Sequence, residues 1–151
     1  MFENNIPEGF NKVESSRIGE VLSLSGSRSA TYFFEGDTIV CSEEVFSKDF
    51  ETASGDTKPI PYLGCTVNGR ETMVPMAAFR RFPRNLETFI KENPSMKDFV
   101  NGSDAERYNL IKGKTIKVIK MVKGEVVDWS KTHKGESAVY KTVSIPVLKI
   151  Q

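Results

Sequence analysis

Basic side chains set among aromatic rings are the residues of this chain whose types and spacing could do chemistry. The segment from Phe79 to Arg84 reads FRRFPR, so three guanidinium groups are interleaved with two phenyl rings. Phenyl rings can stack on nucleobases, and guanidinium groups can contact phosphates. The segment therefore predicts a surface that binds nucleic acid through Phe79, Arg80, Arg81, Phe82 and Arg84.

A second basic cluster follows later in the chain. Five lysines occur between Lys112 and Lys123. A strand rises about 3.3 Å per residue, so lysines at this spacing can follow a phosphate backbone. Alternation along a regular strand would place Lys117 on the face opposite to Lys114 and Lys120, so a bulge, a twist or an edge position is needed to keep all the charges in water. The predicted phosphate ligands are Lys114, Lys117 and Lys120.

Both clusters also have a purely structural interpretation. Phe79 and Phe82 can fill the core under the helix that follows them, with the arginines paired to Glu71, Glu87 or an acidic loop. Lysines are common on exposed sheet edges, where they prevent edge-to-edge aggregation. The sequence leaves both interpretations open.

Two further candidates precede these clusters. The stretch SLSGSRS offers hydroxyl groups, a glycine and Arg28, which suit either a phosphate-binding backbone nest or a plain hairpin tip. Tyr32, Phe33 and Phe34 are consecutive, so alternation must place Phe33 opposite its two neighbours. Exposure of a ring here would extend a base-stacking platform, and Tyr32 is the predicted stacking residue.

The charges are distributed unevenly, although the net charge is only +1. Residues 1–60 carry 5 basic and 11 acidic side chains, whereas residues 107–151 carry 10 basic and 3 acidic ones. The basic part favours binding to nucleic acid, most simply single-stranded DNA. The same gradient also fits an assembly protein, for instance a virion component, in which the acidic part of one copy contacts the basic part of the next. The predicted partners are thus single-stranded nucleic acid or further copies of the chain.

Catalytic and metal-binding patterns are missing from the sequence. It has one histidine, His133, no CxxC pair, and none of the GxGxxG, GxxxxGK[ST], HExxH or GxSxG patterns. The two cysteines, Cys41 and Cys65, each lie in an apolar run, which predicts buried free thiols in a reducing compartment. We therefore expect a protein that is not an enzyme and that uses no cofactor or metal.

The ends of the chain and its hydropathy give an expectation about location. The first residues contain acids and a proline, and no stretch approaches the ~18 apolar residues of a spanning helix. We expect a cytoplasmic protein that does not enter the membrane.

Most of the predicted elements are strands. Residues 17–24, 30–34 and 38–41 have β-compatible patterns. The Asn68-Gly69 dipeptide predicts a tight hairpin over residues 61–76. Residues 115–122, 125–129 and 138–150 read as further strands, and Pro146 favours a sheet edge or a bulge.

The other segments divide into loops and helices. Residues 1–16 are expected to form a flexible N-terminal arm, and the acidic residues 42–59 a long loop. A helical insertion is expected over residues 85–112, because apolar residues recur there at helical spacing, Pro94 stops one helix, and Ser103 with Glu106 forms a capping box.

Together these elements predict one domain over residues 1–151, mainly β with a short helical insertion, folded as a small barrel or sandwich. An OB-like barrel is favoured.

Three segments carry a resemblance to a known group. NGRETMVPMAAFRR at 68–81, LIKGKTIKVIKM at 110–121 and YKTVSIPVLKI at 140–150 resemble small β-rich proteins encoded by crAss-like phages of gut bacteria. The resemblance implies a phage protein that works in the bacterial cytoplasm or in the virion. It implies no functional residue.

Overall fold

An antiparallel sheet of six strands forms the body of the protein in a computed structural model, which describes residues 2, 5–23, 32–51, 54–128 and 130–151. The strand order is β4-β3-β2-β5-β6, and β1 pairs separately with β2. The strands are β1 (Phe10–Lys12), β2 (Thr38–Glu51), β3 (Thr57–Val67), β4 (Arg70–Pro75), β5 (Thr115–Val127) and β6 (Tyr140–Ile150).

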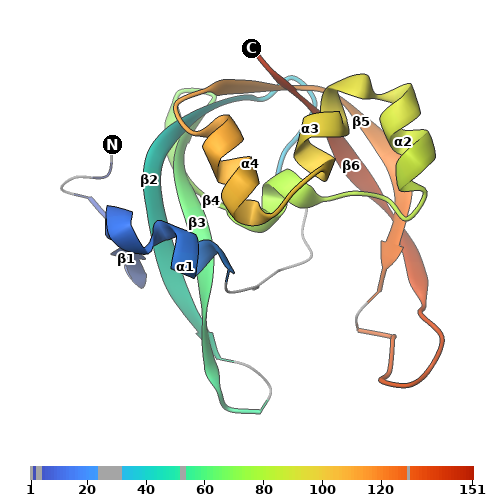
Figure 1. Ribbon diagram of the computed structural model, residues 1–151, viewed down its shortest axis with the longest axis horizontal. Coiled ribbons are helices and arrows are strands. Elements are labelled where there is room, and N and C mark those ends of the chain that lie inside the picture. The colour runs from blue at the N-terminus through green and yellow to red at the C-terminus, as the bar shows by residue number, and fades with distance from the viewer. Residues whose placement is uncertain (1, 3–4, 24–31, 52–53, 129) are drawn as a thin grey trace.

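The sheet is strongly bent. It arches over α3 (Lys97–Val100) and α4 (Asp104–Ile111), and the β2–β3 and β5–β6 hairpins descend on the two sides of the arch (Figure 1). Strands β4 and β6 are the two ends of the strand order, so the sheet is open. The prediction of a mainly β fold with helices inserted is confirmed, whereas closure into a barrel is not.

Strand β2 corrects the prediction of an acidic loop over residues 42–59. It continues to Glu51, and β3 begins at Thr57. Cys41 lies opposite Cys65 and Val45 lies opposite Leu63, so β2 contains two extra residues between these pairs. This bulge breaks the alternation of apolar and polar residues, and the strand therefore resembles a loop in the sequence.

The hairpin predicted at Asn68-Gly69 is confirmed. It joins β3 to β4, and both turn residues have positive φ, 50° for Asn68 and 82° for Gly69, as a type I′ turn requires. The Asn68 side chain also accepts a hydrogen bond from the Thr38 backbone N–H (2.9 Å) and donates one to Asp37 (2.8 Å). The turn is thus tied to the start of β2.

The N-terminal segment differs from its prediction in two ways. Residues 17–23 form the end of a 3-10 turn η1 (Ser15–Arg17) and helix α1 (Ile18–Ser23) instead of a strand. Ile18, Val21 and Leu22 have helical spacing, and the last two are buried. Residues 10–12 pair with β2, and the Phe2 ring packs edge-on against Phe46 at 5.8 Å, so the described part of the predicted arm is docked.

The helical insertion is confirmed. It follows η2 (Met76–Arg80) and contains α2 (Leu86–Glu92), η3 (Pro94–Met96), α3 (Lys97–Val100) and α4 (Asp104–Ile111). Ser103 caps α4 by accepting a hydrogen bond from the Glu106 N–H (3.3 Å). The Tyr108 hydroxyl donates to the Glu43 carbonyl (2.7 Å), so α4 is fastened to the bulge in β2.

Strands β5 and β6 form a long hairpin at the other end of the sheet. Pro146 lies in β6, which is an edge strand, as its missing N–H predicts. Ile116 and Val118 of β5 and Leu148 of β6 are buried in the core that the helices cover. No helix in the described ranges has the length and apolar character needed to cross a membrane.

Candidate nucleic-acid interface

The aromatic residues of the FRRFPR segment are placed mainly inside the protein. Phe79 is fully buried, and its ring centroid lies 5.4 Å from that of Phe33. Phe82 is partly buried against the same core. The predicted base-stacking role of Phe79 is therefore wrong, because its ring completes the core under the sheet.

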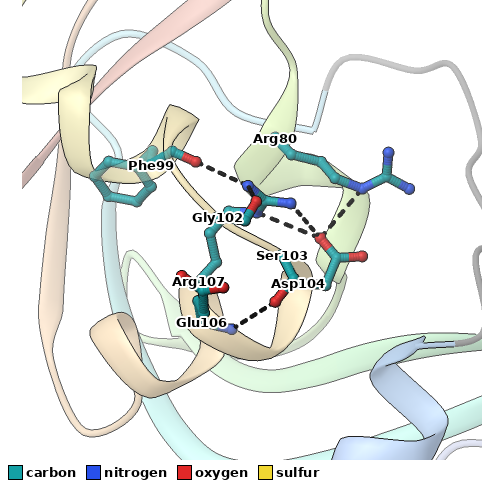
Figure 2. Close-up of polar contacts among 7 residues, drawn as sticks. All are labelled: Arg80, Phe99, Gly102, Ser103, Asp104, Glu106 and Arg107. Carbon is teal, nitrogen blue, oxygen red and sulfur yellow. Dashed lines mark hydrogen bonds and ion pairs between the residues drawn. The ribbon is translucent and has the colours of Figure 1, made fainter.

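Arg80 belongs to an internal network of charges (Figure 2). Its Nε lies 3.3 Å from Asp104 Oδ1, and the same oxygen lies 2.9 Å from Arg107 Nη2. Arg107 also donates hydrogen bonds to the carbonyls of Phe99 (3.0 Å) and Gly102 (2.8 Å). Since Asp104 and Arg107 are nearly buried, this network joins η2 to α3 and α4, and Arg80 has a structural role.

The other two arginines of the segment lie in different environments. Arg81 is half-buried; burial lowers the pKa of its guanidinium, and the charge interaction with Tyr32 opposes that shift. Tyr32 is itself partly buried against the core. Arg84 is exposed, stacks over the Tyr140 ring at 3.9 Å and lies 3.4 Å from Glu125. The three arginines thus do not form one cationic surface.

A one-residue bulge in β5 controls the placement of the lysines. Lys117 lies opposite Lys149 and Lys120 lies opposite Val147, with a register shift at Ile119. Lys149 and Val147 are two residues apart on β6 and so share a face. Lys117 and Lys120 therefore share that face too, although their spacing would separate them on a regular strand. Of the three predicted alternatives, a bulge, a twist or an edge position, the structure shows a bulge.

The ammonium groups of these lysines lie at the surface of the protein. Lys117, Lys120 and Lys149 are exposed, and within the described ranges none of them forms an ion pair. Lys120 is exposed although its partner Val147 is buried, so the exposed face ends there. Lys114 is exposed in the turn before β5. Lys123 shares the face of Ser144 and donates a hydrogen bond to its hydroxyl (3.0 Å).

Exposed apolar side chains occur on the backbone segments next to the lysines. Val40 lies opposite Thr115, on the face of Lys117, and is 42% exposed, while Ile119 is 45% exposed. Phe34 is 66% exposed in a turn that exchanges backbone hydrogen bonds with Val118, through the Gly36 N–H and the Asp37 carbonyl. We call this surface the lysine face; it consists of Lys117, Lys120, Lys149, Val40, Ile119 and Phe34.

Sequence reasoning missed four of its members, which are Lys149, Val40, Ile119 and Phe34. Phe34 follows from the alternation of Tyr32, Phe33 and Phe34, because Phe33 is buried and its neighbour is then turned outward. The sequence does not place Lys149 beside Lys117, because that requires the register of β6 against β5. Arg28 lies outside the described residues.

The described residues hold no candidate metal site, and comparison with known proteins gives no relative. In the part of the chain that the structure describes, no three His, Cys, Asp or Glu side chains converge as a metal site would require. The resemblance to crAss-like phage proteins stays a prediction. No family model, no curated protein and no solved structure matches the chain.

Proposed function

We propose that the protein binds single-stranded nucleic acid on the lysine face. The observation that carries the proposal is the meeting of three exposed lysines, unpaired within the described ranges, with an exposed aromatic ring on neighbouring backbone segments. Lysines neutralise phosphates, and an aromatic ring stacks on bases of any sequence. Such a surface suits a strand whose bases are unpaired.

The spacing and charge of the surface support this function. Lys117 and Lys149 face each other across one strand pair, and Lys120 follows about 7 Å further along the ribbon. The acidic residues Asp49 and Glu51 lie at the far end of β2 from Thr38, which pairs with Lys117. Glu35 and Asp37 lie in the turn beside Val118, but the three lysines outnumber these two acids. The nearly neutral total charge therefore does not prevent a local positive potential.

The proposal is tested by the binding of a fluorescent single-stranded oligonucleotide, measured by anisotropy over a range of salt concentrations. Replacing Lys117, Lys120 and Lys149 together with Ala is expected to weaken binding about tenfold or more. Each neutralised phosphate contributes about 0.7 to the slope of log affinity against log salt, so the slope should fall in magnitude by about 2. The control replaces exposed lysines elsewhere, Lys58, Lys91 and Lys97, and should leave both values unchanged.

The aromatic ring has its own variant. Phe34→Ala should cost about 1–3 kcal/mol of binding free energy if the ring stacks on a base. Phe50→Ala, at the opposite end of β2, is the aromatic control. Equal affinity of the lysine variant and its control contradicts the proposal. A salt-sensitive rise in mass by light scattering, without oligonucleotide binding, contradicts it as well and favours the head-to-tail assembly protein.

A further inference from the structure

A pair of cysteines that nucleic-acid binding does not use lies near the start of β2 and the end of β3, directly before the bulge in β2. Cys41 of β2 and Cys65 of β3 are direct partners in register, 2% and 0% exposed. Both are free thiols, as the sequence predicts. In the chain they are separated by 23 residues, so only the folding of the hairpin brings them together.

The hydrogen-bond pattern shows what kind of pair they form. In antiparallel strands, directly opposed residues alternate between hydrogen-bonded and non-hydrogen-bonded pairs. The Cys41 N–H donates to the Lys114 carbonyl (2.9 Å), away from β3. The Asn68 N–H donates to the Thr38 carbonyl (2.9 Å), so the pair three positions away is hydrogen-bonded. Both observations make Cys41 and Cys65 a non-hydrogen-bonded pair.

This kind of pair brings side chains closest together. The Cα atoms of a non-hydrogen-bonded pair are about 4.5 Å apart, which is within the range that disulfides span. A hydrogen-bonding interaction with the Cys41 thiol, together with burial, raises the pKa of the Cys65 thiol. The folded protein therefore holds two buried thiols in a position to be joined.

We propose that Cys41 and Cys65 are a cross-strand dithiol that closes to a disulfide by exchange with a low-molecular-weight disulfide such as oxidised glutathione. One cysteine thiolate attacks the glutathione disulfide, forming a mixed disulfide and releasing one glutathione. The other cysteine then attacks the protein sulfur of that mixed disulfide and releases the second glutathione. The two protons lost by the cysteines end on the two glutathione thiols, so the exchange needs no other oxidant.

Burial determines when the exchange occurs. Neither sulfur is accessible in the folded protein, and a protonated thiol is a poor nucleophile. The exchange therefore takes place before β2 and β3 have paired, or when they separate. The completed bond then fits the register of the paired strands, because the Cα separation of such a pair lies within the range that disulfides span.

Refolding tests the proposal directly, because both cysteine sulfurs are accessible to glutathione in the unfolded chain. The reduced full-length protein is unfolded in urea and refolded in glutathione buffers that range from reducing to oxidising. Samples are alkylated and their intact mass is measured. We expect two alkyl groups at the reducing end, and at the oxidising end none, with a loss of two hydrogens. Two free thiols or stable glutathione adducts at the oxidising end would overturn the proposal.

A matched control moves the pair by one residue on the same strands. Val40 and Thr66 are direct partners but belong to a hydrogen-bonded pair. The control chain carries Cys41→Ala, Cys65→Ala, Val40→Cys and Thr66→Cys. The glutathione buffer in which half of its molecules hold the disulfide should be about tenfold more oxidising than the corresponding buffer for the natural pair. Equal closure of the two pairs would contradict the geometric basis of the proposal.

Thermal unfolding of the natural chain gives a readout that needs no variant. The disulfide constrains the unfolded chain, so the oxidised protein should unfold at a temperature about 10 °C higher than the reduced protein. A lower unfolding temperature after oxidation would show that the bond strains the strands, which contradicts closure in register.

Discussion

The FRRFPR segment and the lysines of β5 look alike as basic clusters in the sequence, but the fold uses them in opposite ways. Arg80 is bound to Asp104 inside the protein and Phe79 is fully buried. Lys117 and Lys120 remain exposed on one side of a ribbon. The difference shows that a basic cluster is neutralised where the fold supplies an internal carboxylate and stays exposed where it does not.

The local sequence explains the difference. Arg80 is the last residue of the short turn η2, which lies beside Asp104 at the start of α4, and the other two arginines follow it. Guanidinium groups also suit partly buried ion pairs better than ammonium groups do. The lysines instead occupy a strand near the sheet edge, where one face contacts the core and the other contacts water. Four substitutions test this contrast.

The largest effect is expected from Phe79→Ala. Removing a fully buried phenyl ring that packs against Phe33 should lower the free energy of unfolding by about 4 kcal/mol. Urea unfolding followed by circular dichroism measures the change. A loss below about 1 kcal/mol would mean that the ring is not part of the core, and would restore its candidacy as a stacking residue.

The second effect concerns the charge network. Asp104→Asn leaves Arg80 and Arg107 without their shared carboxylate, and Arg107 is only 7% exposed. The free energy of unfolding should fall by about 3 kcal/mol, because an uncompensated charge remains buried. Asp98→Asn, an exposed acid on α3, is the control and should have almost no effect.

A third substitution tests the contact between the two regions. A Cβ atom at Gly124 of β5 would lie 2.8 Å from Pro83 Cβ and 2.7 Å from the Ile145 side chain. Because the proline ring cannot rotate away, Gly124→Ala should cost about 2 kcal/mol of stability. Gly55→Ala is not a suitable control because Gly55 has positive φ; Gly19→Ala meets no neighbouring atom within 4 Å and serves instead.

The smallest effect is expected at Arg84. Its pair with Glu125 is more than half exposed, so Arg84→Ala should change the free energy of unfolding by less than about 1 kcal/mol. If the lysine face is the binding surface, oligonucleotide affinity should change less than in the triple lysine variant. A loss as large as that of the triple variant would assign the FRRFPR segment a part in binding.

Local signals predicted the elements that depend on local chemistry. Asn68-Gly69 specified a hairpin, and Ser103 with Glu106 specified the start of α4. Both features arise from backbone geometry within a few residues, so they are visible without knowledge of the fold. The same is true of Pro146 at a sheet edge.

Features that depend on distant partners could not be predicted. The acidic residues after Cys41 belong to a strand because β3 and β1 pair with them, and the bulge hides the strand pattern. The segment 17–23 is too short for the spacing of its apolar residues to distinguish a helix from a strand. The sequence alone cannot show that Arg80 contacts Asp104 and not phosphate, because Asp104 belongs to a different element, α4.

The extra residue at Ile119 also affects how this chain should be aligned with others. The residues on its two sides keep regular partners on β6, so the two segments of β5 are offset by one position. A related chain that lacks the extra residue needs a single gap at Ile119. Without that gap, an alignment would match Lys117 or Lys120 to a side chain on the opposite side of the ribbon.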